Sequence, residues 1–144
     1  MRTIILSFLL IITSLSADTF SKAYAAYSSG DKQKAFKLFG KACDSGHIDA
    51  CYNLGLLYSH GEGIKQDKQK AIVFFEKACT GDQINACYNL AISYSYGQGV
   101  NQNKQKATSL YEKACDGGYI SACSNLGNMY DNGEGVKQNK RKDY

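Results

Sequence analysis

The six cysteines of this chain offer its clearest chemistry, because their positions repeat with a fixed period. Two sets have members 36 residues apart: Cys43, Cys79 and Cys115, and Cys51, Cys87 and Cys123. An even number of cysteines in an exported protein indicates disulfides. Metal binding is the alternative, but the spacing within each repeat is not that of a Cys-x2-Cys zinc knuckle, and the two histidines are not placed to complete a site. We therefore expect no metal ion and no other cofactor.

A set of asparagines with the same period is the best candidate for binding. An Asn amide both donates and accepts hydrogen bonds, so a ladder of such side chains could hold a peptide backbone or a carboxylate. A hydrogen bond to the adjacent helix is the plainer alternative. Neighbouring positions on the same outer face differ between copies, as a recognition surface requires, although surface drift explains that variation nearly as well. The predicted binding residues are Asn53, Asn89, Asn125, His60, Tyr96 and Asn132.

Hydrolytic chemistry has less support from the residues. A serine enzyme acting on β-lactams needs Ser-x-x-Lys at a helix start, together with Ser-Asp-Asn and Lys-Thr-Gly elements. One Ser-x-x-Lys match runs from Ser29 to Lys32, but it falls in a turn and the other two elements are absent from the sequence. No Ser, His and Asp arrangement stands out either. We therefore predict no catalytic residue.

The first seventeen residues have the composition of a secretory signal peptide. Arg2 gives a positive start, residues 4–12 are apolar, and small residues precede a cleavage after Ser16 or Ala17. The apolar run is too short to span a bilayer, so we expect a secreted or periplasmic protein with no membrane span after signal removal. An uncleaved anchor is the alternative. Signal removal lowers the formal net charge from +4 to +3, which is not a nucleic-acid-binding signature.

The elements that position these residues are helices. The segments IDACYNLGLLYS, INACYNLAISYS and ISACSNLGNMYD place apolar or small residues at i, i+3, i+4 and i+7, as in Cys51, Leu54, Gly55 and Tyr58. Each segment is followed by a Gly-x-Gly loop and by a second helix that begins with Lys. The expected N-caps of these second helices are Asp67, Asn103 and Asn139. The small residue in this pattern, such as Gly55, implies that a neighbouring helix approaches the first helix closely.

A fixed period near 36 residues is typical of stacked-repeat proteins. We predict an all-α fold, an α/α solenoid of antiparallel helix pairs with about seven helices and one disulfide per repeat junction. After the signal peptide (1–17), the repeat domain (18–144) comprises a cap pair (18–43) and repeats at 44–79, 80–115 and 116–144. The last repeat is incomplete, and we expect the chain to be a truncated form of a longer array.

The pattern A-x-x-x-L-G-x-x-Y-x-x-G-x-G-V, followed by Lys-Ala and an aromatic pair, resembles the Sel-one-like repeat, a tetratricopeptide-related family. The resemblance covers roughly Phe20 to Tyr144, nearly the whole mature chain. The added Cys-x7-Cys of each repeat resembles the Helicobacter cysteine-rich proteins. That resemblance implies a secreted or periplasmic solenoid with one disulfide per repeat. It also implies penicillin binding with weak β-lactamase activity, or interaction with host proteins or peptides.

The disulfide partners follow from the helix order. Cys43 ends a second helix and Cys51 lies in the first turn of the next helix, so the two side chains meet across an antiparallel junction. Six cysteines allow fifteen pairings, and the repeat favours one of them. The predicted disulfides are Cys43–Cys51, Cys79–Cys87 and Cys115–Cys123.

Two functions remain open at this point. The first is an interaction module that binds a peptide or a peptidoglycan fragment, or a host or envelope protein, along its concave face. The second is a penicillin-binding protein that hydrolyses β-lactams. A ridge of basic residues is either a solvated face or a contact for an anionic surface: Lys68, Lys70, Lys104, Lys106, Lys140 and Arg141.

Overall fold

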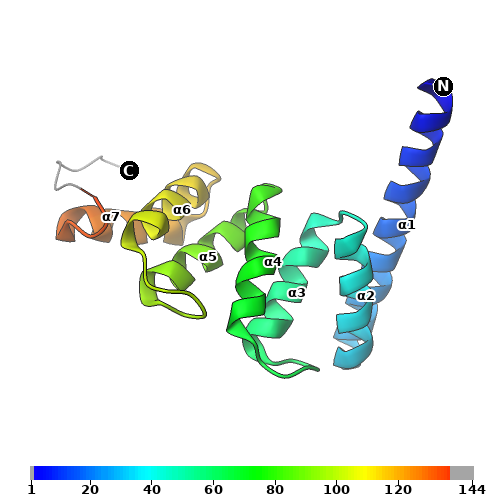
Figure 1. Cartoon of the computed structure of the whole chain (residues 1–144), viewed down its shortest axis with the longest axis horizontal. Coiled ribbons are helices and arrows are strands. Elements are labelled where there is room, and N and C mark those ends of the chain that lie inside the picture. Colours follow the sequence, from blue (N-terminus) through cyan, green and yellow to red (C-terminus); the bar gives the residue numbers. More distant parts are fainter. Residues whose placement is uncertain (1, 137–144) are drawn as a thin grey trace.

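The computed structural model describes the backbone of residues 2–136 and the side chains of residues 14–136. Seven helices and no strand occur in this range (Figure 1). Their bounds are α1 (Arg2–Ser28), α2 (Lys32–Asp44), α3 (Ile48–His60), α4 (Lys68–Thr80), α5 (Ile84–Tyr96), α6 (Lys104–Asp116) and α7 (Ile120–Asn132). Consecutive helices pack as antiparallel pairs that follow one another along the molecule. The predicted all-α solenoid is therefore confirmed.

The N-terminal helix α1 contains both the predicted signal segment and the first helix of the cap pair. Signal cleavage stays a prediction, because the side chains of residues 1–13 lie outside the described part of the chain. No helix among the described residues is long and apolar enough to cross a membrane. The expected second helix of the last repeat, including Asn139, also lies outside the described residues.

Helix ends are set by capping residues, and the predicted N-caps Asp67 and Asn103 are among them. The side chains of Asp31, Asp67 and Asn103 each accept a hydrogen bond from the backbone N–H three residues later, which satisfies a donor of the first turn. At the other end, α3 is terminated by Gly61 in the left-handed region, with φ of 73°. Gly97 and Gly133 end α5 and α7 in the same way.

Each junction between repeats carries one disulfide. The structure contains Cys43–Cys51, Cys79–Cys87 and Cys115–Cys123, so the predicted one bridge per junction is confirmed. The bridges lie within the core, where the side chains of Cys43, Cys51 and Cys87 are fully buried. Each bridge joins the end of one second helix to the start of the next first helix.

Close helix packing explains the small residue at position 55. A Cβ added at Gly55 would lie 2.7 Å from the ring of Phe75 on α4. Because Phe75 is itself buried at 3% exposure, the ring has little room to move. The inferred close approach of a neighbouring helix is therefore correct at this position.

The Gly-x-Gly loops have a packing role that the sequence alone does not reveal. The second glycine of each loop lies against the first residue of the preceding second helix. A Cβ at Gly99 would lie 2.6 Å from the carbonyl carbon and oxygen of Lys68, and Gly63 and Gly135 stand in the same relation to Lys32 and Lys104. Each loop thus holds the start of the second helix in the repeat before it.

A lysine near the end of each later second helix connects it to the preceding one. The Lys77 ammonium donates to the Cys43 carbonyl at 3.0 Å, and the Lys113 ammonium donates to the Cys79 carbonyl at 2.9 Å. Carbonyls at a helix C-terminus lack intrahelical partners and carry partial negative charge, so a lysine is favourable there. These bonds link successive second helices to each other, whereas each disulfide links a second helix to the next first helix.

We expect Lys77→Met and Lys113→Met each to lower the free energy of unfolding by about 1 kcal/mol, the usual net value of one hydrogen bond. Methionine keeps the apolar stem and removes the charge. Lys41→Met is the matched control, because Lys41 has the same repeat position but α2 has no preceding second helix. Urea denaturation followed by circular dichroism measures the three values. Equal values for all three variants would show that these bonds do not couple the repeats.

Candidate binding site on the first-helix face

Two pockets open on the face formed by the first helices α3, α5 and α7, which we call the first-helix face. The first pocket encloses about 160 Å³ between α3 and α5. Its lining is Leu56, Ser59, His60, Phe75, Asn89, Ile92, Ser93 and Gln98. Leu56, Phe75 and Ile92 provide an apolar floor. Polar groups from α3, α5 and the following loop form the remainder.

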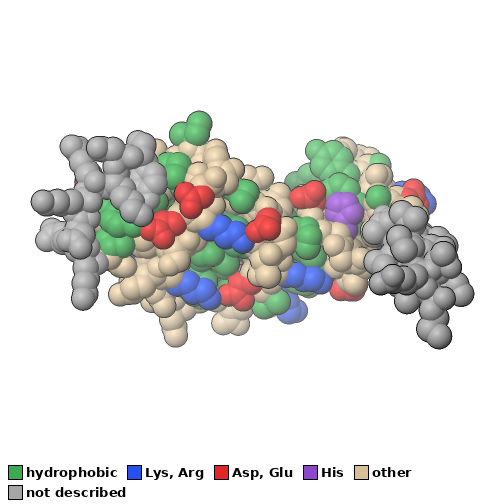
Figure 2. Space-filling view, turned by 90° about the horizontal axis from the view of Figure 1, so that it is seen from above, with side chains coloured by type: hydrophobic (Ala, Val, Ile, Leu, Met, Phe, Trp, Pro, Cys, Tyr) green, Lys and Arg blue, Asp and Glu red, His purple; other side chains and the backbone are tan. Residues whose placement is uncertain are grey.

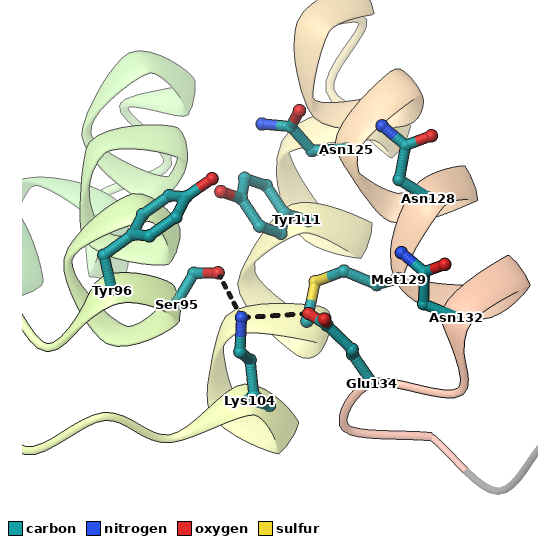
Figure 3. A pocket seen from close by; sticks show the side chains of 9 residues that line it. All are labelled: Ser95, Tyr96, Lys104, Tyr111, Asn125, Asn128, Met129, Asn132 and Glu134. Atoms are coloured by element: carbon teal, nitrogen blue, oxygen red, sulfur yellow. Dashed lines mark hydrogen bonds and ion pairs between the residues drawn. The ribbon is translucent and has the colours of Figure 1, made fainter.

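The second pocket encloses about 230 Å³ between α5 and α7. Its lining is Ser95, Tyr96, Lys104, Tyr111, Asn125, Asn128, Met129, Asn132 and Glu134. Figure 3 shows the hydroxyl groups of Tyr96 and Tyr111 pointing toward each other, with three asparagines on the facing helix α7. This pocket is more polar than the first one.

The two pockets are the same site in successive repeats. Adding 36 to Ser59, His60, Phe75 and Asn89 gives Ser95, Tyr96, Tyr111 and Asn125. Gln98 becomes Glu134 in the same way. Each pocket is smaller than the roughly 300 Å³ at the lower end for drug-sized ligands. A ligand that fills both pockets must therefore be extended along the solenoid. A more open depression of about 470 Å³ at Gly97–Asn101 offers few side chains for chemistry.

The structure places five of the six predicted binding residues in these pockets. His60 and Asn89 share the first pocket, and Tyr96, Asn125 and Asn132 share the second. Asn53 lines neither pocket and instead donates to the Asp49 carbonyl of its own helix at 2.8 Å.

The plainer reading of the asparagines, a hydrogen bond to a neighbouring helix, also describes part of the structure. The Asn89 amide lies 3.5 Å from the Tyr52 hydroxyl on α3. Asn125 hydrogen-bonds Tyr111 on α6. The asparagines are half-buried, so each retains hydrogen-bonding capacity on the pocket side.

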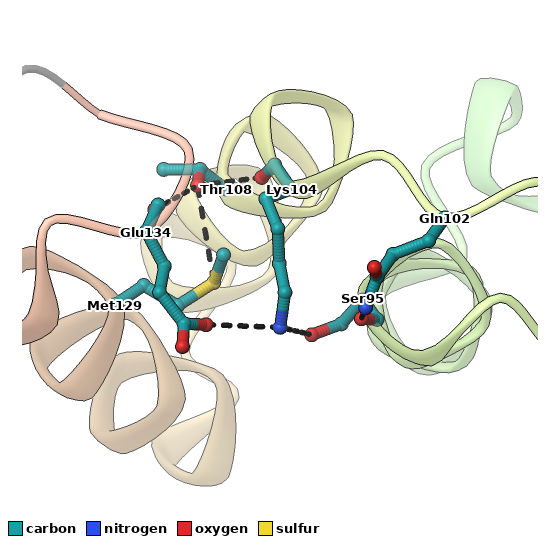
Figure 4. A network of polar contacts seen from close by, with 6 residues as sticks. All are labelled: Ser95, Gln102, Lys104, Thr108, Met129 and Glu134. Atoms are coloured by element: carbon teal, nitrogen blue, oxygen red, sulfur yellow. Dashed lines mark hydrogen bonds and ion pairs between the residues drawn. The ribbon is translucent and has the colours of Figure 1, made fainter.

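A charged network closes the second pocket. The Lys104 ammonium lies 2.9 Å from a Glu134 carboxylate oxygen and 3.4 Å from the Ser95 hydroxyl (Figure 4). Burial raises the pKa of the Tyr111 hydroxyl to about 12, against the opposing effect of hydrogen bonds with Asn125 and Ser95. The phenol therefore stays protonated at physiological pH and remains a hydrogen-bond donor in the pocket floor.

Two Ser–Lys pairs among the described residues were candidates for a hydrolytic centre, and neither has its geometry. Ser29 donates to the Ala26 carbonyl, and Lys32 is 3.3 Å from the Glu62 carboxylate, so the Ser-x-x-Lys match forms no pair. Ser95 and Lys104 are close, but Ser95 is only 5% exposed. The Lys104 ammonium is ion-paired with the Glu134 carboxylate, whereas a general base must be neutral and free to accept the serine proton.

Charges elsewhere on the described surface are mixed. Acidic and basic side chains alternate over the face seen in Figure 2. Three of the predicted ridge lysines have carboxylate partners: Lys70 with Asp67, Lys104 with Glu134, and Lys106 with Glu76. Lys140 and Arg141 lie outside the described residues. Within the described part of the chain, no group of three or more His, Cys, Asp or Glu side chains could hold a metal ion.

Sequence reasoning missed Lys104, Tyr111 and Glu134 as pocket residues. Lys104 and Tyr111 belong to the second helix of one repeat, and Glu134 belongs to the loop of the next. The available signal was the exchange of Phe75 for Tyr111 and of Gln98 for Glu134 at equivalent positions of two copies. A polar group at a core position needs a hydrogen-bond partner, so its presence indicates a polar or hydrated cavity beside it.

Comparison with known proteins gives a consistent result. The Sel1 repeat model matches residues 23–47, 48–82, 84–119 and 120–142. The proposed β-lactamase HcpE of Helicobacter pylori (strain ATCC 700392 / 26695) is 42% identical over 43 residues, covering 30% of this chain and 12% of HcpE. The chain thus spans a small part of that relative.

Two solved structures are similar over most of the chain. A Sel1 repeat protein from Oxalobacter formigenes has a TM-score of 0.78 at 32% identity, covering 86% of this chain and 52% of that one. Cysteine-rich protein B of Helicobacter pylori has a TM-score of 0.69 at 28% identity, covering 84% of this chain and 91% of that one.

Proposed function

This chain belongs to the Sel1 repeat family, and we propose that it is an exported interaction module that binds a peptide or a cell-wall fragment along its first-helix face. The observation that carries the proposal is the recurrence of one pocket at a 36-residue step. Repeat solenoids use such periodic surfaces to bind extended ligands. The three disulfides and the similarity to Helicobacter cysteine-rich proteins support a location outside the cytoplasm.

Different linings give the two pockets different preferences. The first pocket, with Leu56, Phe75 and Ile92, suits an aliphatic group. The second, with Asn125 and Asn128 in its wall, suits a neutral group that forms hydrogen bonds. A single extended ligand with both kinds of group in the right order would be selected over one with the order reversed.

The asparagines provide a test with an internal control. We expect Asn89→Ala and Asn125→Ala each to weaken binding of a selected peptide or muropeptide by about tenfold, the cost of a lost hydrogen bond in a partly buried site. Asn53→Ala should leave affinity unchanged, because Asn53 lines neither of the two pockets. Isothermal titration with ligands chosen from a random peptide library and a muropeptide panel gives the affinities. Unchanged affinity in all three variants would remove the asparagines from the site.

The second candidate function, β-lactam hydrolysis, rests on the name of HcpE. A chromogenic cephalosporin incubated with the oxidised protein tests it directly. We expect no saturable turnover, because Ser95 is buried and the lysine beside it is ion-paired with Glu134. Turnover that is lost on Ser95→Ala or Lys104→Met would establish the enzyme and overturn the preference for a binding module.

A further inference from the structure

One ion pair between the second helices and the Gly-x-Gly loops repeats along the solenoid, with a single exception. The first residue of α2, Lys32, lies 3.3 Å from a carboxylate oxygen of Glu62 in the following loop. The first residue of α6, Lys104, lies 2.9 Å from Glu134 in the equivalent position. The first residue of α4 is Lys68, and its equivalent loop partner is Gln98. The middle lysine therefore faces an amide where its counterparts face a carboxylate.

The Lys68 ammonium has no carboxylate within ion-pair distance among the described residues, and it meets only the Gln98 amide oxygen at 3.5 Å. The Glu62 carboxylate lies 4.0 Å from a ring nitrogen of the pocket's His60. That carboxylate is already held by Lys32 and by the Tyr27 hydroxyl at 2.9 Å. The middle repeat thus presents a positive charge that the fold itself does not neutralise.

The Lys68 ammonium is connected to the more apolar of the two pockets through Gln98, whose amide oxygen lies 3.5 Å from it. Gln98 lines the first pocket together with Asn89 and His60, above the floor of Leu56, Phe75 and Ile92. Amide and ammonium donors beside an apolar floor match a chemical group that carries a carboxylate and an alkyl chain on one carbon atom. A peptide C-terminus with an aliphatic last residue is such a group. The volume of about 160 Å³ admits a group of this size and excludes a complete drug-sized ligand.

We propose that the pocket between α3 and α5 binds the terminal carboxylate of a peptide whose last residue is aliphatic, and that this carboxylate pairs with Lys68 as Glu62 and Glu134 pair with Lys32 and Lys104. The proposal rests on the proposed function, since it names the end of the extended ligand and its place on the first-helix face. The remainder of the ligand then extends toward the pocket between α5 and α7 or toward α1.

The carboxylate that the middle repeat lacks can be introduced at Gln98, and the carboxylate of the following repeat can be removed at Glu134. Gln98→Glu recreates in the middle repeat the lysine–carboxylate pair of the neighbouring repeats, so the fold should tolerate it. The new internal carboxylate should displace the ligand's own carboxylate and weaken binding of a free-acid peptide by about tenfold or more. Glu134→Gln is the reciprocal variant: it frees Lys104 beside the second pocket, where a free acid should then be preferred over its amide.

The test uses acetylated hexapeptides ending in each of the twenty amino acids, prepared as free acids and as C-terminal amides, with fluorescence anisotropy as the readout. We expect acids ending in Leu, Ile or Val to bind wild type best, and to lose about tenfold affinity on amidation or in Gln98→Glu. Internal peptides with a Glu side chain and an amidated end distinguish a side-chain carboxylate from a terminal one. Preference for that set would overturn the terminal assignment.

Two further outcomes separate this inference from the proposed function. Acids and amides that bind wild type and Gln98→Glu equally well would leave peptide binding in place and overturn the carboxylate site. A library with no binder at all, for a protein whose circular dichroism shows intact helices, would overturn both.

Discussion

Reduction of the three disulfides is expected to lower the free energy of unfolding by up to about 7 kcal/mol, since a loop of this length contributes roughly 2.5 kcal/mol in the chain-entropy model. Each bridge closes a short loop with a sequence separation of 8. Total stabilities of single domains are about 5–15 kcal/mol, so the reduced chain should be at or near the unfolding threshold. Urea titrations with and without a phosphine reductant, followed by circular dichroism, measure the difference.

The position of the bridges explains why this loss should affect the whole chain. Each repeat contacts only its neighbours, and the disulfide ties the two elements that form each junction. Cys79→Ala combined with Cys87→Ala removes one central bridge without leaving a free thiol. We expect a loss of about 2.5 kcal/mol or more, because the substitutions also leave a small cavity in the core. Identical denaturation midpoints for oxidised and reduced protein would contradict the prediction.

The helices, the caps and the disulfide partners could be predicted from the sequence because they depend on residues close together in the chain. Cys43 and Cys51 are separated by one tight turn, and Asp67 caps the helix that begins at the next residue. Such local relations repeat with the period of the sequence. Three aligned copies therefore reveal them without knowledge of the packing between repeats.

The pockets could be predicted only in part, because they form between repeats. Asn89 and His60 were found from periodicity on one helix face. Lys104 and Glu134 were not, since their contact requires the loop of one repeat to fold back on the second helix of the repeat before it. The Glu, Gln and Glu of the three loops were visible in the sequence. Their meaning appeared only when the structure placed a lysine opposite each of them.

Gly99→Ala is expected to destabilise the chain by about 3 kcal/mol or more, through backbone strain and a steric clash together. Gly99 has φ of +75°, a region where a Cβ costs roughly 1–2 kcal/mol. The added Cβ would also lie 2.6 Å from the carbonyl carbon and oxygen of Lys68. These are backbone atoms at the start of α4, so relief requires the loop and the helix to separate.

Gly118→Ala is the matched control, because Gly118 has φ of +89° but no atom within 4 Å of an added Cβ. Its cost of about 1–2 kcal/mol measures the strain alone, and the difference between the two variants measures the contact between the loop and α4. Equal costs would show that the loop moves away freely and does not hold the preceding repeat.

The same contact places Gln98 beside Lys68, since Gln98 precedes Gly99 in the loop. Gly99→Ala should therefore weaken binding of a free-acid peptide even under conditions where the helices remain folded, whereas Gly118→Ala should not. Stability and carboxylate recognition would then depend on one loop, which each repeat supplies to the repeat before it.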